Sequence, residues 1–370
     1  MNLSRIGATG LLLLTAGSGF ASAQVVGPRD NCNVFVNGGT AGDLFNACIA
    51  GDLGRLNAIA IPSAVSRAVA NSFHIGPEIV GPQVVEPTGL QGLIAADPDQ
   101  HLQPSPFVIS PAADVAAAAP AAAVAWNAWA NGRYLHSDYS SSGGGLDGGT
   151  ATGIAGLDYK LTSKLTLGML ISAETSSLDS ALNDYNSRNF GIGPYLGLVL
   201  TDNIVFSANA QRSWIESDST GGLLNFDTDR VQASGSLNGY WYFGTWRVNP
   251  SATVTWSKDW ETENSGFFAD REIEVGVFVP ALQAGKTLRL SDKATVEPWA
   301  GAALDVTFLS DVRITGFPTD SDPNTDLRLQ AGLNFGFGDN AQLAITGEAS
   351  GLLLEDFDNY SIDANLAVQF

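Results

Sequence analysis

Histidine, serine and aspartate, the side-chain types of a nucleophilic hydrolase, occur side by side at His136, Ser137 and Asp138. A nucleophile needs a base within hydrogen-bond reach, and the base needs an orienting group. If this segment is a strand, adjacent side chains point to opposite faces, so His136 and Ser137 cannot pair locally. His136 and Asp138 would share a face, which fits a simple ion pair. His74 and His101 lack a nucleophile motif such as G-x-S-x-G. We therefore assign no catalytic residue and expect no enzymatic activity.

Carboxylates form the second candidate group. They gather in four polar stretches: Asp218, Asp227 and Asp229; Asp259, Glu261, Glu263 and Asp270; Asp311, Asp320, Asp322 and Asp326; and Glu355, Asp356 and Asp358. Such oxygens could hold Ca²⁺, but no D-x-D-x-D-G loop organises them. Solvated loops are the favoured interpretation. No Cys or His cluster has metal-ligand spacing, so we assign no metal site and expect no cofactor.

The elements that would position these residues are strands. From Trp126 onward apolar and polar residues alternate, and the last stretch is the clearest, with Tyr360, Ile362, Ala364, Leu366, Val368 and Phe370 on one face. A strand shows this period of two, and about 9–11 tilted residues cross a bilayer. The pattern predicts twelve strands, at about 126–138, 151–162, 164–177, 188–200, 204–216, 229–243, 246–258, 270–283, 294–308, 326–337, 341–353 and 360–370.

The connections between these strands alternate in length. Short turns are expected near 163, 201–203, 244–245, 290–293 and 338–340, and longer polar loops near 139–150, 178–187, 217–228, 259–269, 309–325 and 354–359. Outer-membrane barrels place short turns in the periplasm and long loops outside. The fold class is therefore predicted to be all-β, a 12-stranded antiparallel transmembrane β-barrel with an irregular, partly helical N-terminal segment. A soluble β-sandwich is the alternative; the small polar residues of one wall and the terminal aromatic count against it.

Strand register places a set of charged side chains toward the barrel lumen: Glu297, Asp305, Arg328, Glu348 and Asp363. They could make a weakly cation-selective channel, or pair with one another and with a plug. Pairing is the favoured interpretation because a twelve-stranded lumen is narrow. Inward glycines such as Gly191, Gly193 and Gly301 would leave room for such a plug.

The N-terminus has the form of a secretory signal. Residues 1–23 carry Arg5, an apolar run over 6–15 and an A-x-A pattern at 21–23, which predicts a signal peptide and entry through the Sec translocon. The chain has a formal net charge of −20, 15% charged residues, 41 Gly and two Cys. Phosphate binding needs clusters of Lys and Arg, so nucleic acid is not expected as a partner. Outer-membrane lipid is expected as a partner. The acidic loops could also bind lipopolysaccharide through bridging divalent ions.

Residues 24–111 are rich in proline and show no period of two, so long strands and helices are excluded there. Cys32 and Cys48 lie in this exported region, where a disulfide is expected; two buried thiols are the alternative. Residues 112–124 are almost all Ala. They favour a helix by propensity but contain Pro120, so they could form a pore helix or a flexible linker.

A barrel at residues 125–370, ending in Tyr360–Phe370, resembles the autotransporter translocator domain of type V secretion. Softer patterns that carry the resemblance lie at 191–196, 285–287 and 297–301. It implies a passenger upstream of the barrel, linked through a helix in the lumen, and 112–124 occupies that linker position. The passenger would be short and lacks the repeats of a β-helix. Tyr360, Ile362, Leu366, Val368 and Phe370 resemble the terminal signal by which the barrel-assembly machinery inserts such barrels.

The expected function is that of an outer-membrane barrel that anchors, and exposes at the cell surface, a short N-terminal segment. The alternative is a stand-alone channel whose N-terminal region stays in the periplasm. A monomer is expected, and the sequence identifies no surface ligand.

Overall fold

The computed structural model describes residue 65 and residues 126–139, 146–180, 184–219, 225–264, 271–314, 325–338, 340–353 and 357–370. Within these ranges strands dominate: β1 (Trp126–Tyr139), β2 (Leu146–Lys160), β3 (Leu165–Ser180), β4 (Asp184–Thr201), β5 (Ile204–Ser219), β6 (Asn225–Gly239), β7 (Trp241–Phe243), β8 (Trp246–Asn264), β9 (Arg271–Lys286), β10 (Leu288–Ser291), β11 (Ala294–Ile314), β12 (Thr325–Phe337), β13 (Ala341–Ser350) and β14 (Phe357–Gln369).

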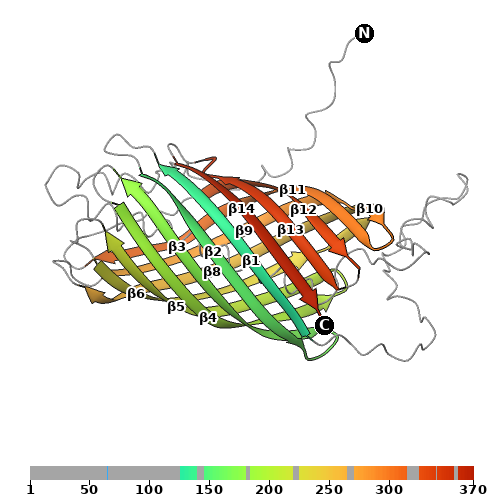
Figure 1. Cartoon of the computed structure of the whole chain (residues 1–370), viewed down its shortest axis with the longest axis horizontal. Helices are drawn as coiled ribbons and strands as arrows, with labels where there is room; N and C mark the ends of the chain where they lie inside the picture. The colour runs from blue at the N-terminus through green and yellow to red at the C-terminus, as the bar shows by residue number, and fades with distance from the viewer. Residues whose placement is uncertain are drawn as a thin grey trace, which may run out of the picture.

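The strands close into an antiparallel barrel (Figure 1). Neighbours in sequence pair with one another around the ring, and β1 closes it by pairing with β14 from Asn127↔Gln369 to Tyr139↔Phe357. At the seam the Trp126 amide donates to the Phe370 carbonyl at 3.3 Å, and the Phe370 amide donates to the Trp126 carbonyl at 3.1 Å. Closure satisfies the backbone groups that an open edge would expose to lipid.

Among the described residues, fourteen segments make twelve barrel strands, because two strands are interrupted. Tyr240 separates β6 from β7, and Thr287 separates β9 from β10. At the first break the Tyr240 amide donates to the Asn203 carbonyl at 2.8 Å, a bond to the neighbouring turn. Both β7 and β10 continue their strands, pairing with β8 and β11. The predicted twelve-stranded barrel is confirmed.

Short and long connections separate to opposite ends of the barrel. The short ones, at 161–164, 202–203, 244–245, 292–293 and 338–340, lie at the end that holds Trp126 and Phe370. We call this the short-turn end; the C-terminus marks it in Figure 1. At the far end the strands run further than predicted, so much of 178–187, 217–228 and 259–269 is strand. Beyond the bilayer both faces of a strand meet water, so the polarity alternation that marks a strand disappears there.

The two faces of the wall differ as an outer-membrane barrel requires. Large apolar side chains cover the outside: Leu167, Met169, Ile171, Phe278, Leu282, Leu329, Leu333 and Leu366 are among the exposed ones. Small polar side chains line the inside, as on β6, where Gln232, Ser234, Ser236 and Asn238 are buried. Tyr242, which its position beside a short turn would place among the interfacial aromatics, instead packs against residues of the interior.

No helix among the described residues is long and apolar enough to span a membrane.

Candidate functional site in the barrel lumen

Near the short-turn end, large aromatic rings lie flat along the inner wall over glycines of adjacent strands. Trp129 on β1 covers Gly156 of β2, and Tyr195 on β4 covers Gly168 of β3. A Cβ atom at either glycine would meet the ring in front of it. The period of two brings these residues to the inner face, and the missing side chains let the rings settle against the backbone.

Atoms of neighbouring residues therefore occupy the space beside the inward glycines. At Gly191 the space is occupied by the Gln211 amide and the Ser172 hydroxyl, and Gly193 lies against the backbone of the next strand. At Gly301 a Cβ atom would come within 2.8 Å of the Gln283 Cγ. The expectation that these three glycines leave room for a helix is wrong, because residues on adjacent strands already fill the positions that the missing side chains vacate.

A chain of hydrogen bonds fixes the two rings. The Trp129 Nε1 donates to the Tyr195 hydroxyl at 2.7 Å, and that hydroxyl donates to Asp158 Oδ2 at 2.6 Å. Asn127 Nδ2 donates to the same oxygen at 2.8 Å. All four residues are buried, and the chain joins β1, β2 and β4 across the inner wall. Bonds to a buried carboxylate are among the stronger ones in proteins, so the ring positions are well determined.

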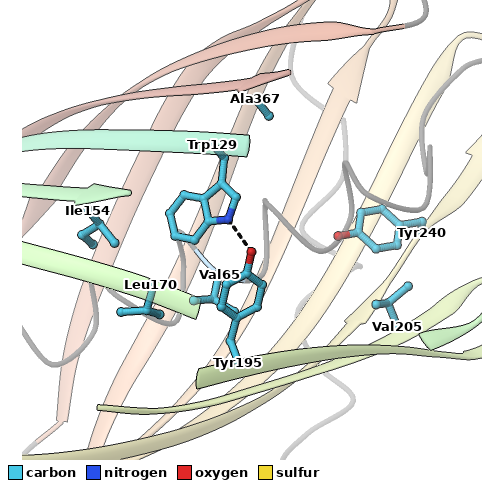
Figure 2. Packing of buried hydrophobic residues seen from close by; sticks show 8 residues of the cluster. All are labelled: Val65, Trp129, Ile154, Leu170, Tyr195, Val205, Tyr240 and Ala367. Atoms are coloured by element: carbon cyan, nitrogen blue, oxygen red, sulfur yellow. Dashed lines mark hydrogen bonds between the residues drawn. The ribbon is translucent and has the colours of Figure 1, made fainter. Parts of the chain in front are cut away.

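Around these rings the wall forms an apolar belt, which we define as Trp129, Ile154, Leu170, Tyr195, Val205, Tyr240 and Ala367. Its members come from β1 to β5, from the break after β6 and from β14. Val65, which has helical backbone and no exposed surface, belongs to the same cluster. Figure 2 shows Val65 together with the belt residues of this cluster. Val65, which precedes β1 in the chain, thus lies in the barrel interior.

Arg133 is the second inward residue after Trp129 on β1, and it belongs to a charge network. We define this network as Arg133, Asp305, Arg328 and Glu348. Arg133 Nη2 lies 3.0 Å from Glu348 Oε1, and Arg328 reaches Glu348 at 3.2 Å and Asp305 at 2.8 Å. Gln330 adds a bond to Glu348 at 2.7 Å. The four charged side chains are 5–7% exposed and come from four strands. Two cations face two anions, so the network is neutral.

Two further ion pairs line the lumen. Arg247 Nη2 lies 2.7 Å from Glu297 Oε1, which also accepts a bond from Asn334 at 3.0 Å. Arg230 holds Asp259 in a bidentate pair, with bonds of 2.7 and 2.6 Å. The planar guanidinium suits this geometry. Each pair joins neighbouring parts of the wall, so the lumen charges named here compensate one another locally.

Comparison with known proteins shows which kind of outer-membrane barrel this chain resembles. Residues 128–262 match the family model described as "Autotransporter beta-domain". The barrel is an autotransporter-type outer-membrane β-barrel. Its fold is similar to the translocator domain of the autotransporter NalP from Neisseria meningitidis, with a TM-score of 0.50 and 14% identity over 66% of this chain and 88% of that one. It is also similar to the β-domain of the Bordetella autotransporter BrkA, with a TM-score of 0.54 and 14% identity over 66% of this chain and 100% of that one. No curated protein sequence matches the chain significantly.

The autotransporter-type barrel brings three of the five predicted lumen charges together in one network. Asp305, Arg328 and Glu348 meet in the charge network, whereas Glu297 pairs separately with Arg247 near the short-turn end. Asp363 is buried on β14, where it accepts a bond from Ser361 at 3.4 Å. All five carboxylate or guanidinium groups lie on the inner face, opposite the exposed apolar face of the same strands.

Sequence reasoning missed three arginines: Arg133, Arg230 and Arg247. Arg230 precedes the regular polar face of β6, so a signal was available. On β1 the inner face mixes Arg133 with Trp129 and Leu135, which conceals its polarity. The pair of Arg133 and Glu348 also spans strands that are distant in sequence, and only the closed ring brings these two residues together.

The acidic stretches are not simply solvated loops. Asp229 and Asp259 lie on strands and pair with arginines, and Asp326 is buried on β12, where it accepts the Gly351 amide at 2.7 Å. His136 is paired with Asp147 of the neighbouring strand at 3.6 Å. Asp138, its expected partner, lies opposite that same Asp147 in the ladder.

The residues of the predicted assembly signal form one outward face of β14. Tyr360, Ile362, Leu366, Val368 and Phe370 are all exposed to the lipid side. Cys32, Cys48 and residues 112–124 lie outside the described residues, as do the predicted signal peptide and most of the proline-rich region. The disulfide and the linker helix therefore stay predictions.

Proposed function

We propose that this protein anchors its N-terminal region in the outer membrane and exposes a short part of it at the cell surface. The barrel supplies the anchor through its apolar outer face. The exposed part would come from residues 24–124, which precede β1. In this proposal the protein has no catalytic activity and acts as a monomer without a cofactor.

The observation that carries the proposal is that both ends of the barrel lie at the short-turn end. Trp126 and Phe370 exchange backbone hydrogen bonds there, so the chain upstream of β1 starts at that mouth. In outer-membrane barrels the short turns face the periplasm. The lumen is then the direct route from this mouth to the outside, and Val65 already packs inside it.

The proposal extends to how the protein reaches its place. Entry through the Sec translocon follows from the predicted signal peptide. Insertion by the barrel-assembly machinery fits an autotransporter-type barrel whose last strand presents Tyr360 to Phe370 toward lipid. Lipid and lipopolysaccharide would be the surrounding partners.

An epitope accessibility experiment on intact cells tests the exposure. One epitope is placed between Gly38 and Gly39 and another beside Pro87. An epitope within 315–324, at the long-loop end, serves as the outside control, and one between Gly244 and Thr245 serves as the periplasmic control. We expect antibody binding to at least one N-terminal epitope in intact cells, as for the outside control. Binding to both N-terminal epitopes only after permeabilisation would reject exposure and favour the stand-alone channel with a periplasmic N-terminal region.

A further inference from the structure

Two cations lie on the lipid-facing side of the wall near the long-loop end, opposite the short-turn end. On β5 the side chain of Arg212 is 55% exposed and lies opposite the lipid-exposed Ile192, whereas the adjacent Gln211 is buried on the inner face. Lys258 of β8 also faces outward, and Val231 of β6 lies between the two cations in the ladder. Strands lie about 4.8 Å apart, so about 10 Å separates the two Cα atoms. A charge on the lipid face of a barrel is costly at depth, so an anion beside it stabilises it.

Tryptophans accompany both cations. Trp214 and Trp260 lie two residues further toward the long-loop end, on the strands of Arg212 and Lys258 respectively. The guanidinium carbon of Arg212 lies 5.4 Å from the centroid of the Trp214 ring, and the ring of Phe190 stacks on Trp214 with 6.2 Å between centroids. Tryptophan rings mark the level of the lipid headgroups at a membrane interface. The two cations therefore lie at the headgroup level, on the lipid side of these rings.

Carboxylates on the same face orient the two cations. Arg212 Nη2 lies 2.6 Å from Asp229 Oδ2, and the Asp229 side chain is 13% exposed. Asp229 lies between the two tryptophans in the ladder. Lys258 is paired with Glu272 of β9. A guanidinium has five N–H donors and an ammonium has three, so one carboxylate orients each cation and further donors can reach a second anion.

A different sector of the outer wall carries the opposite charge at this end. Five aspartates lie in register on the outward faces of β14, β1, β2, β3 and β4: Asp358, Asp138, Asp147, Asp179 and Asp184. An anionic headgroup is repelled by this row and attracted to the two cations. The charge pattern of the outer wall thus directs an anion to the sector of β5 to β8, whose neighbouring strands can be followed in Figure 1.

We propose that Arg212, Trp214, Lys258 and Trp260 form a binding site for the phosphorylated headgroup of lipopolysaccharide. We call these four residues the headgroup site. Two cations about 10 Å apart fit a headgroup with two phosphates, the guanidinium binding one through paired N–H donors and the ammonium binding the other as a point charge. The indole rings would cover the apolar faces of the sugars. The site rests on the proposed orientation of the barrel, in which the long-loop end faces the outer leaflet.

Binding of lipid A to the purified full-length protein in detergent tests the site, with native mass spectrometry as the readout. Arg212→Gln with Lys258→Gln removes both cations. Lys164→Gln with Lys286→Gln is the matched control, since both lysines are exposed at the short-turn end and Lys286 lies 5.6 Å from the ring centroid of Trp246. In EDTA we expect bis-phosphorylated lipid A to bind the wild type and the control alike. It should bind the double variant about tenfold more weakly, because bonds to charged groups are lost.

Three further variants separate recognition from folding. A heat-modifiability gel shows whether each barrel is folded, because Arg212→Gln leaves Asp229 without its cation. Arg212→Lys keeps the charge and should retain most of the affinity. Arg212→Gln with Asp229→Asn removes the ion pair as a unit and should bind lipid A as weakly as Arg212→Gln alone. This pair variant keeps the test available if the loss of one partner prevents folding.

Other anions identify the source of the phosphate. Dephosphorylated lipid A should bind the wild type weakly, phosphatidylglycerol should lose less affinity than lipid A in the double variant, and inorganic phosphate should not displace lipid A. Equal lipid A binding by the double variant and the control overturns the site, and so does binding that requires divalent cations. An equal loss for phosphatidylglycerol, or displacement by inorganic phosphate, overturns the assignment to lipopolysaccharide. These readouts do not depend on the N-terminal epitopes, so failure of the site and failure of surface exposure are distinguishable.

Discussion

At the scale of single residues, the lumen depends on polar groups that satisfy one another out of contact with bulk water. Removing one partner of such a bond leaves the other buried and unsatisfied, which costs more than the bond itself contributes. Two residues, Tyr195 and Glu348, each hold two or more partners. Substitutions at these positions should therefore have effects far larger than at exposed residues of the same type.

Tyr195→Phe removes the hydroxyl that joins Trp129 to Asp158. We expect the free energy of unfolding to fall by about 1–3 kcal/mol, because a buried indole N–H loses its acceptor. Urea unfolding of the refolded barrel in detergent, followed by tryptophan fluorescence, measures this change. Tyr360→Phe, on the exposed outer face, is the control and should change stability little. Equal stability of the two variants would show that the bonded chain contributes nothing.

Glu348→Gln removes the anion between Arg133 and Arg328. Breaking a buried ion pair from one side costs about 3 kcal/mol, because the remaining charge loses its compensation. The same unfolding measurement should detect it, with the exposed Glu216→Gln as the control. The lumen also gains net positive charge, so any residual current should shift toward anions. A variant as stable as the control would contradict the proposed role of the network.

At the scale of elements, neighbouring strands interlock through glycines that receive aromatic rings. Gly168 has no room for a Cβ atom because the Tyr195 ring lies against it, whereas Gly132 has nothing within 4 Å of that position. The two glycines differ in what faces them, although both are strand residues. Replacing each glycine by alanine therefore tests the packing of the ring on Gly168. The change in strand propensity is the same at both positions.

Gly168→Ala should displace the Tyr195 ring and weaken its bonds to Trp129 and Asp158. We expect a loss of about 1–3 kcal/mol, typical of overpacking. Gly132→Ala should be neutral or slightly stabilising, since alanine loses less freedom than glycine on folding. Unfolding midpoints of the two variants, measured side by side, decide the matter. An equal effect at both positions would mean that ring packing on Gly168 is unimportant.

The strands could be predicted from the sequence because lipid and lumen impose opposite polarity on alternate residues. On β12 the apolar set beginning at Leu327 and the polar set beginning at Arg328 fall on the predicted faces. The prediction failed where this contrast ends. Beyond the bilayer, as at Asp218 and Asp227, both faces are polar, and strand residues resemble a loop. The ion pairs could not be predicted, because Arg133 meets Glu348 only once the ring has closed.

The final strand carries a prediction on assembly. Phe370 ends the outward face of β14 and is bonded to Trp126 at the seam. Deleting it should deplete the folded, heat-modifiable barrel in outer membranes several-fold. Phe337→Ala, which removes another exposed aromatic at the same end, is the control and should assemble normally. Normal levels after the deletion would count against an assembly signal in this strand.

At the scale of the whole molecule, an N-terminal region precedes the barrel of residues 126–370. Val65, the residue of this region that the structure describes, packs in the barrel interior. The chain has only two cysteines, and both lie in this N-terminal region, so its redox state can be read without interference from the barrel.

We predict that Cys32 and Cys48 form a disulfide in the mature protein. The bridge would stabilise the small loop it closes by about 3 kcal/mol. Alkylation of the denatured protein without reduction should then add no label, and alkylation after reduction should add two. Labelling of both thiols without reduction would show that the bridge is absent, and Cys32→Ser with Cys48→Ser serves as the unlabelled reference.

The pairing of β1 with β14 also determines how long the chain has an open strand edge that could pair with other chains. These two strands are the first and the last of the barrel to be synthesised, and each is the other's partner. Until β14 has been synthesised and has reached β1, the edge of β1 that β14 covers in the barrel has no partner. Such an edge can pair with any other chain that presents one. Contacts so distant in sequence form slowly. Safe delivery of this protein therefore depends on shielding its earliest strand for the whole of its transit, until the last strand arrives to cover it.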